Sequence, residues 1–165
     1  MNSVGEQQYY YEKLTTKANK GDATAQYLLG LSKLRGEKTQ NYEEALNWFK
    51  LAAIQKHREA QYNLAVLYEK GLGIEKNDIK ALLWYHVAAE NEHPKAQFNL
   101  AVFFLNGRGT APNQEEAVRW FTRASSQGID EATQNLVLLS KLVDNTELKA
   151  KQLREFHNGF GLLTQ

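Results

Sequence analysis

The sequence predicts an all-α solenoid of about three full helix-turn-helix repeats of 35–36 residues, with partial capping helices at both ends. Two observations carry this prediction. Trp48, Trp84 and Trp120, the three tryptophans of the chain, lie 36 residues apart both times. The segment Ala-Gln-Tyr-Asn-Leu-Ala-Val over residues 60–66 returns, with Phe in place of Tyr, over residues 96–102. Such a period is typical of repeat proteins in which each unit packs on the next.

Each repeat contains two helical patterns. In the second copy, apolar residues recur with helical spacing from about residue 60 to residue 70 and predict a first helix. This helix ends at Gly71-Leu72-Gly73, because glycine adopts the left-handed backbone of a helix C-terminus without strain. A second pattern from about residue 78 to residue 91 predicts the helix that completes the hairpin. The glycines follow a helix rather than a strand, so they indicate a turn and not a phosphate-binding loop.

Capping residues recur at the predicted helix starts. Asn41, Asn77 and Asn113 stand just before the second helix of each copy and are interpreted as N-caps. In the first and third copies a glutamate follows three residues later, which completes a capping-box pattern. Asp22 is expected to cap the first helix of the first copy, and Pro94 suits the first turn of the third copy.

Small and large residues at fixed repeat positions predict how the helices pack. Gly30, Ala65 and Ala101 occupy one position of the first helix and should allow the second helix to approach closely. The tryptophans are expected to fill the gap between successive hairpins. On this interpretation, truncation of Trp84 to alanine would cost about 3–5 kcal/mol of stability.

The chain is expected to form one repeat domain over residues 1–165. Its first segment aligns with a degenerate second helix, and its last copy lacks the Gly-x-Gly turn. At the C-terminal end we expect two helices, over residues 132–143 and 146–157. The predicted boundaries are an N-terminal capping helix at 6–20, repeats at 23–58, 59–94 and 95–130, a partial repeat with a C-terminal capping helix at 131–158, and a tail at 159–165.

Composition excludes several classes of function. Twenty basic residues against 19 acidic ones leave a net charge of +1, which offers no global attraction to nucleic acid or to an anionic membrane. The absence of cysteine excludes a disulfide scaffold, a cysteine-ligated metal and a thiol nucleophile. We expect no cofactor. Because the N-terminus lacks the apolar region of a signal peptide, we expect a cytoplasmic protein, or a periplasmic one if a signal sequence has been removed.

The recurring residues resemble the Sel-one-like repeat, a relative of the tetratricopeptide repeat. The resemblance lies in Ala-Gln-Tyr at 60–62, Gly-x-Gly at 71–73 and Ala-x-x-Trp-Tyr-x-x-Ala-Ala at 81–89, and it covers roughly residues 10–145. The first copy departs from the pattern, because no second glycine follows Gly36. The resemblance implies a right-handed α/α superhelix that acts as an adaptor, scaffold or inhibitor, with its partner on the concave face. Some bacterial members serve as immunity proteins against toxic effectors.

The resemblance also places a binding groove. In the related tetratricopeptide geometry the first helix of each hairpin lines the inner surface, where rings and aliphatic side chains would accept a protein segment with apolar anchors. A purely structural role for the rings is the alternative, and the recurring asparagines could bind either a partner's backbone or a neighbouring helix. The predicted partner-binding residues are Tyr27, Leu31, Arg35, Tyr62, Asn63, Val66, Glu69, Lys70, Phe98, Asn99, Val102, Asn106, Gln134 and Leu138, with Lys141 at the edge.

The leading hypothesis is a non-catalytic module that binds one protein partner, either a folded domain or an extended peptide, without nucleic-acid binding or membrane insertion. A sharper version is an immunity protein, because three repeats and two caps leave room for holding a partner and for no second activity. The alternatives are a scaffold that self-assembles through its end caps and, less favoured, a hydrolase. His57 and His93 occupy one repeat position in successive copies, so we expect helix caps or exposed side chains rather than shared metal ligands.

Overall fold

The structure, a computed structural model, describes residues 3–34 and 41–160, without the side chains of residues 3–4, 143–145, 148–150 and 152–160. Helices account for most of the described chain, as the sequence predicts. Their bounds are α1 (Ser3–Asn19), α2 (Ala23–Leu34), α3 (Tyr42–Ala53), α4 (Arg58–Lys70), α5 (Asp78–Glu90), α6 (Pro94–Asn106), α7 (Gln114–Ser126) and α8 (Asp130–Phe160).

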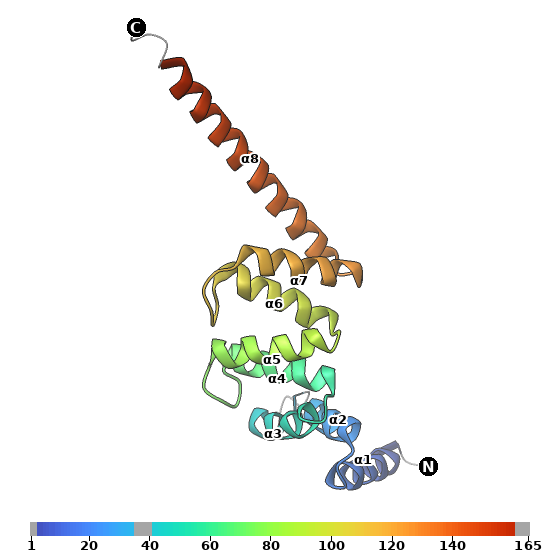
Figure 1. Cartoon of the computed structure of the whole chain (residues 1–165). Coiled ribbons are helices and arrows are strands. Elements are labelled where there is room, and N and C mark those ends of the chain that lie inside the picture. Colours follow the sequence, from blue (N-terminus) through green and yellow to red (C-terminus); the bar gives the residue numbers. More distant parts are fainter. Residues whose placement is uncertain (1–2, 35–40, 161–165) are drawn as a thin grey trace.

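The helices form a stack of hairpins. The pairs α2 with α3, α4 with α5, and α6 with α7 make the most extensive contacts, and each first helix also packs on the second helix of the preceding pair. Figure 1 shows the hairpins one above the other, with α1 at one end and α8 running away from the other end. The prediction of an all-α solenoid of three repeats is confirmed.

The predicted caps are present. The Oδ1 atoms of Asn41, Asn77 and Asn113 each accept a backbone N–H three residues further on, at 2.9–3.1 Å. Asp22 accepts the corresponding N–H of α2 at 2.7 Å, and Pro94 occupies the first turn of α6. Because these groups satisfy N–H donors that have no partner within the helix, they determine where each helix begins.

The Gly-x-Gly turns allow neighbouring hairpins to touch. Gly71 ends α4 in the left-handed conformation, with φ at 69°. The second glycine of each turn lies against the preceding hairpin: a Cβ on Gly109 would lie 2.5 Å from the carbonyl oxygen of Asp78, at the start of α5. Any side chain there would force the backbones apart. The first copy's turn, where no second glycine follows Gly36, lies outside the described residues.

The close approach within each hairpin is confirmed at the predicted small residues. A Cβ on Gly30 would lie 2.5 Å from the ring of Phe49 in α3. Ala65 and Ala101, at the same repeat position, are fully buried. The fourth residue of this series is Val137, which remains 47% exposed because no second helix follows to cover it.

The tryptophans contribute unequally to the packing: Trp120 is 2% exposed and belongs to the core. Trp48 and Trp84 pack against the core but are only half-buried, so they are not the central residues of their junctions. Adjacent residues on a helix point about 100° apart, and it is the next residue along the chain that faces the core. Those fully buried aromatic residues are Phe49, Tyr85 and Phe121.

The C-terminal end also differs from the expectation. Instead of separate helices over 132–143 and 146–157, one continuous helix runs from Asp130 to Phe160. The sequence contains no glycine or proline between residues 130 and 158 that would end it. Among the described side chains of α8 only Ala132 and Leu139 are buried, so α8 packs on α7 near its start and then leaves the stack (Figure 1).

A buried glutamine in each first helix joins neighbouring hairpins. The Nε2 atoms of Gln26, Gln61 and Gln97 donate to the carbonyl oxygen of the last buried alanine of the preceding second helix, at 3.0–3.2 Å. Their Oε1 atoms accept from an amide side chain at the end of the same hairpin's second helix, at 2.7–2.8 Å. These glutamines are 1–4% exposed, so their bonds to the alanine carbonyl groups are made away from water, while the bonds from the amide side chains are half-buried.

We therefore expect Gln61→Met to lower the free energy of unfolding by about 2–3 kcal/mol, because the buried carbonyl group of Ala53 and the half-buried amide of Asn91 lose their partner while the side-chain volume is kept. Chemical denaturation followed by circular dichroism measures the effect. The control is Gln134→Met, an exposed glutamine of α8, which should change stability by less than about 0.5 kcal/mol. Equal effects of the two variants would contradict the role assigned to Gln61.

A second prediction compares adjacent aromatic residues of α3. Phe49→Ala should cost about 3–5 kcal/mol, since it opens a cavity in the core. Trp48→Ala should cost less than about 2 kcal/mol, because much of that side chain already contacts solvent. Thermal and chemical unfolding of both variants provide the comparison, and a larger loss for Trp48→Ala would show that the tryptophan is the packing residue after all.

Candidate protein-binding surface

The predicted groove residues lie on the face formed by α2, α4, α6 and the start of α8, which we call the first-helix face. The structure places them there in two groups of different exposure. Arg35 lies outside the described residues. The half-buried members are Tyr27, Leu31, Tyr62, Asn63, Val66, Glu69, Phe98, Asn99 and Val102, and the exposed members are Lys70, Asn106, Gln134, Leu138 and the edge residue Lys141.

The rings of this face are held by contacts within the stack. Tyr62 stacks on the imidazole of His93, with ring centroids 4.4 Å apart and an angle of 9° between the planes. Tyr27 stacks in the same way on His57, at 4.6 Å. Phe98 packs at 5.6 Å on the buried ring of the second helix in its own hairpin. These contacts show that the rings have a structural role. Each ring is half-buried, so part of it remains accessible to a partner.

The two stacked histidines are helix caps, as the sequence predicts. Nδ1 of His93 accepts the N–H of Ala96 at 3.2 Å, and Nδ1 of His57 accepts that of Ala60 at 3.4 Å. An acceptor at Nδ1 requires a neutral imidazole. Burial lowers the pKa of His93, which favours this neutral form; Glu59 opposes the shift, while Arg58 and Lys95 add to it.

The recurring asparagines do not behave alike. Asn63 and Asn135 donate to the carbonyl oxygen four residues earlier in their own helices, at 2.8 and 2.7 Å. Asn99 instead lies near the phenol groups of Tyr62 and Tyr85, whose pKa values are raised by burial and lowered to a smaller extent by Asn99. Both asparagine bonds stay within one helix, so the predicted bond to a neighbouring helix is absent at Asn63 and Asn135, and Asn99 lies in a polar cluster with Tyr62 and Tyr85.

That cluster continues into a network between the second and third hairpins. Arg108, from the turn after α6, pairs with Glu69 at 2.6 Å and with both carboxylate oxygens of Asp78 at 2.9 and 3.2 Å. Tyr85 donates its hydroxyl proton to Glu69. The guanidinium group also lies 4.0 Å from the ring centroid of Phe103. Four side chains from two hairpins therefore form one connected unit at the edge of the first-helix face.

Sequence reasoning included Glu69 but missed the other three members of this network. A signal was present in the repeat alignment, because three of the four network residues are polar where matched copies are apolar. Arg108 stands where the second copy has Leu72, and Glu69 stands where its neighbours have Leu34 and Leu105. Tyr85 stands where the other copies have phenylalanine. Polar residues that replace apolar ones at matched repeat positions would have indicated this junction.

The electrostatics of the network favour fixed charges. Hydrogen bonding to Arg108 lowers the pKa of Asp78, and the same bond raises the pKa of Arg108. Burial and the neighbouring Glu69 raise the pKa of Tyr85, so its hydroxyl group remains a donor. Each charged group already has a partner, which suits a rigid recognition element better than a proton-transfer site.

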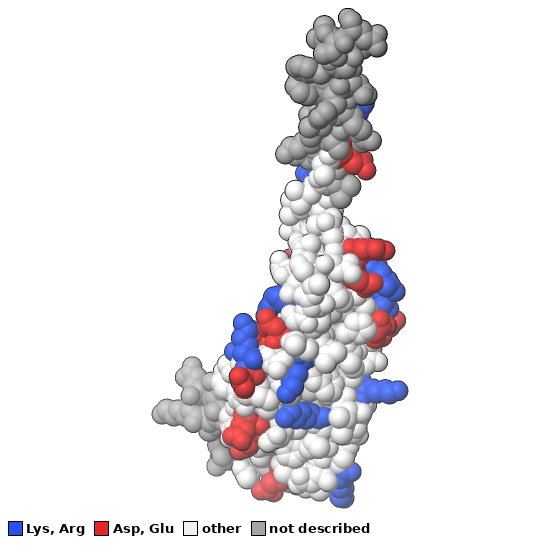
Figure 2. Space-filling view, turned by 60° about the vertical axis from the view of Figure 1, so that its left-hand side comes forward, with Lys and Arg blue, Asp and Glu red and all other residues white. Residues whose placement is uncertain are grey.

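The part of the chain that the structure describes has neither a cluster of metal-ligating side chains nor a membrane-spanning helix. No group of three or more histidine, aspartate and glutamate side chains there is arranged to hold a metal ion. Within the same residues, no helix is both long and apolar enough to span a bilayer. Figure 2 shows basic and acidic residues interspersed over the face that it presents.

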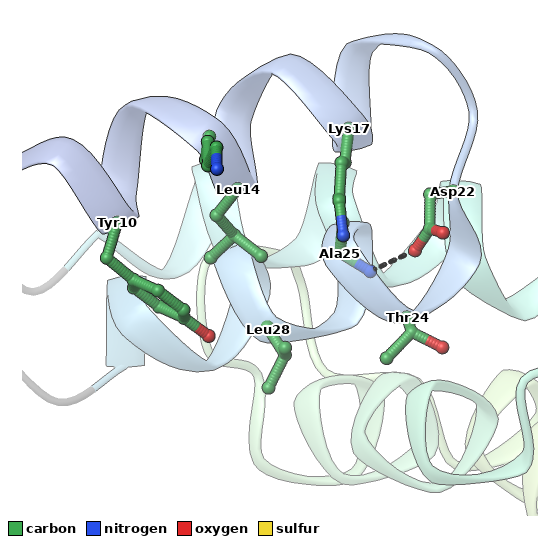
Figure 3. A pocket seen from close by; sticks show the side chains of 8 residues that line it. Tyr10, Leu14, Lys17, Asp22, Thr24, Ala25 and Leu28 are labelled. Atoms are coloured by element: carbon green, nitrogen blue, oxygen red, sulfur yellow. Dashed lines mark hydrogen bonds between the residues drawn. The ribbon is translucent and has the colours of Figure 1, made fainter.

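A shallow cavity of about 270 Å³ lies between α1 and α2, at the N-terminal end of the stack (Figure 3). Tyr10, Leu14 and Lys17 of α1 line one side of it, and Leu28 of α2 lines the other. Tyr10 and Lys17 occupy positions at which the repeats carry buried alanines, so they cannot pack under a further helix as those alanines do. The cavity is smaller than most ligand pockets and indicates a cap rather than a binding site.

The most exposed large apolar side chains of the stack lie on the second helices of the hairpins and not on the first-helix face. Between residues 12 and 136, every described large hydrophobic residue above 36% exposure belongs to α3, α5 or α7 or follows directly on α3. We call this side of the molecule the second-helix face. The residues concerned, none of which was predicted as a binding residue, are Leu51, Ile54, Ile79, Leu83, Val87 and Val118.

Comparison with known proteins identifies the repeat. Residues 23–57, 58–93 and 94–129 each match the Sel1 repeat. No curated protein matches the sequence. A Sel1 repeat protein from Oxalobacter formigenes has a similar crystal structure, with a TM-score of 0.70 and 32% identity over 76% of this chain and 95% of that chain.

Two further solved structures are similar over about the same part of the chain. One is a protective antigen with an SLR fold from uropathogenic Escherichia coli strains, with a TM-score of 0.72 and 30% identity over 74% of this chain but only 27% of the antigen. The other is cysteine rich protein B of Helicobacter pylori, with a TM-score of 0.63 and 21% identity over 76% of this chain and 94% of that chain. This last likeness shows the fold alone.

The cap formed by His93 predicts a pH dependence of stability. Because the folded-state pKa lies below that of an unfolded histidine, about 6.5, the unfolded chain binds the proton first as the pH falls. The contribution of His93 is therefore complete above about pH 6.5 and is lost progressively below it. His93→Asn keeps a cap acceptor that does not titrate, so denaturant midpoints between about pH 7.5 and 5 should fall less steeply than in the wild type. His86→Asn, at an exposed histidine of α5, is the control and should keep the wild-type slope.

Proposed function

The chain belongs to the Sel1 repeat family, and on that premise we propose that it is a non-catalytic protein-interaction module that holds one protein partner on its first-helix face. Solenoids of this family generally serve as protein-interaction modules. The proposal about this chain concerns the surface that it uses and the kind of segment that it holds.

The observation that carries the proposal is the matched pair of apolar sites on neighbouring hairpins. Tyr62 and Val66 on α4 stand one repeat before Phe98 and Val102 on α6, and all four are half-buried. Contacts with the stack already restrict the rings, so a partner would lose little further side-chain entropy on binding them. Such a surface suits a segment that presents two apolar anchors one repeat apart.

Polar groups beside these sites would fix the direction of the bound segment. Asn99 lies near the phenol groups of Tyr62 and Tyr85, and its amide can both donate and accept a hydrogen bond. The network of Glu69 and Arg108 borders the same junction with side chains that are 23% and 28% exposed. We infer that a partner places polar backbone or a side-chain donor near this junction and its apolar anchors over the rings.

The biological role that fits best is an adaptor, scaffold or inhibitor, with an immunity protein as the sharpest form of the hypothesis. Its support is the first-helix face, whose matched apolar sites suit the holding of a protein partner. A hydrolase is less well supported, because the two half-buried carboxylates at this junction, Glu69 and Asp78, are both engaged by Arg108.

Affinity capture from the native cell's lysate, with identification by mass spectrometry, tests the proposal. The test variant is Val66→Gln/Val102→Gln, which removes apolar contact from the first-helix face and spares the rings that support the fold. The control is Ile54→Gln/Val118→Gln, which makes the same change on the second-helix face. The melting temperature of each variant must first be shown to lie within a few degrees of that of the wild type.

We expect the wild type and the control to retain a stoichiometric partner that the test variant binds at least about 10-fold more weakly, as for the loss of a hot spot. Purified partner and isothermal titration calorimetry then give the ratio of the dissociation constants. Loss of the partner by the control with retention by the test variant would assign binding to the opposite face and refute the proposal.

A further inference from the structure

Helix α5 is apolar on two sides. Its inner side is buried in the core, as it is in α3 and α7. Its outer side carries Ile79, Leu83 and Val87, which are 61%, 59% and 40% exposed. A spacing of four residues places the three side chains on one stripe of the helix, where a surface helix normally carries polar residues. At the corresponding positions α3 has Glu43, Asn47 and Leu51, and α7 has Glu115, Arg119 and Arg123.

We propose that this stripe is a self-association site, on which α5 of a second copy of the chain packs antiparallel to α5 of the first. The inference goes beyond the proposed function, because it concerns the opposite face and a different partner. It rests on the symmetry of the stripe: Ile79 and Val87 lie four residues on either side of Leu83. Antiparallel pairing about Leu83 places Ile79 of each copy against Val87 of the other, so the two apolar stripes cover each other.

Charge complementarity selects this partner and this orientation. Lys76 and Glu90 lie seven residues on either side of Leu83, beyond the two ends of the stripe. Lys76 lies in the turn just before α5, and antiparallel pairing places this turn of each copy beside Glu90 at the end of α5 of the other, where two equivalent ion pairs can form. Parallel pairing would oppose like charges at both ends. The carboxylate of Glu90 is available, since its side chain is 51% exposed and its contact with Arg123 is long, at 3.7 Å.

The charges on the flanking helices favour the same antiparallel orientation. Both α3 and α7 carry glutamates in the first turn and a basic residue in the last turn. In an antiparallel arrangement the acidic ends of these helices approach the basic ends of their counterparts. Arg119, which stands level with Leu83 on α7, pairs with Glu116 of its own helix at 3.0 Å, and this limits its repulsion of the second Arg119.

The stripe is narrow, so we expect a weak and reversible dimer. Stable interfaces bury about 800 Å² on each partner, which three side chains of one helix do not reach without their neighbours. Leu51 and Val118 on the flanking helices extend the apolar surface to either side. An interface of this kind is isologous, so it closes at two copies and does not build fibres.

Sedimentation velocity of the full chain from about 2 to about 200 µM tests the proposal over the range expected of a weak interface. The wild type should pass from monomer to dimer across this range. Leu83→Glu should remain monomeric, because it places two carboxylates face to face at the centre. Leu142→Glu, on the 62%-exposed apolar side chain of α8, is the matched control and should dimerise like the wild type. Circular dichroism verifies that all variants are folded.

The ion pairs provide a sharper test. Lys76→Glu and Glu90→Lys should each be monomeric, because each homodimer would contain two repulsive contacts. An equimolar mixture of the two variants should dimerise, because one variant is then acidic at both ends of the stripe and the other is basic at both ends. The heterodimer therefore restores two ion pairs. No model in which the two positions act independently predicts this recovery.

A wild type that stays monomeric up to about 200 µM would overturn the inference. So would a dimer that survives Leu83→Glu or dissociates with Leu142→Glu, since the interface would then lie elsewhere. Failure of the mixture to recover the dimer would overturn the antiparallel register. None of these outcomes changes the partner capture described above, so the two proposals succeed or fail separately.

Discussion

The buried glutamine of each first helix is the interaction on which the rest of the stack depends. Gln61 donates to the end of the preceding second helix and accepts from the end of its own hairpin, so one side chain sets the relative position of three helices. Its burial makes the geometry strict, because an amide away from water must keep both partners. The same contacts recur at Gln26 and Gln97, which gives each junction the same geometry. At α8 the series ends with Thr133, which is exposed and bonds Ser125 instead.

The junctions built in this way also position the candidate binding surface. Because His93 caps α6 from the turn after α5, its ring lies where Tyr62 of the previous hairpin can stack on it. The cap therefore orders a groove residue as well as a helix terminus. Arg108 acts at the same junction from the other end of the hairpin, where the Gly-x-Gly turn brings it against Asp78. The second and third hairpins thus present one rigid surface rather than two independent ones.

The solenoid divides its apolar surface unequally between its two faces. The first-helix face holds its rings half-buried and fixed, whereas the second-helix face exposes aliphatic side chains concentrated on α5. Only one of the outer helices has such a stripe, so the repeat architecture does not require it. This difference between copies, more than the features that the copies share, indicates where the molecule meets other molecules.

Much of the fold followed from the period of the sequence alone. Some residues act only on the chain next to them: Asn77 accepts a nearby N–H group, and Gly71 adopts the left-handed backbone that ends a helix. Their roles could therefore be inferred without knowing how the helices pack on one another. The Sel-one-like motif also indicated which helix face to examine. The choice between Trp84 and Tyr85 for the core depended on how one helix is rotated against the next, which a period of 36 residues does not contain. The network of Arg108 with Glu69 likewise depends on contacts between segments that are distant in the sequence, and only the tertiary structure decides these. The continuity of α8, by contrast, agrees with the lack of glycine and proline between residues 130 and 158.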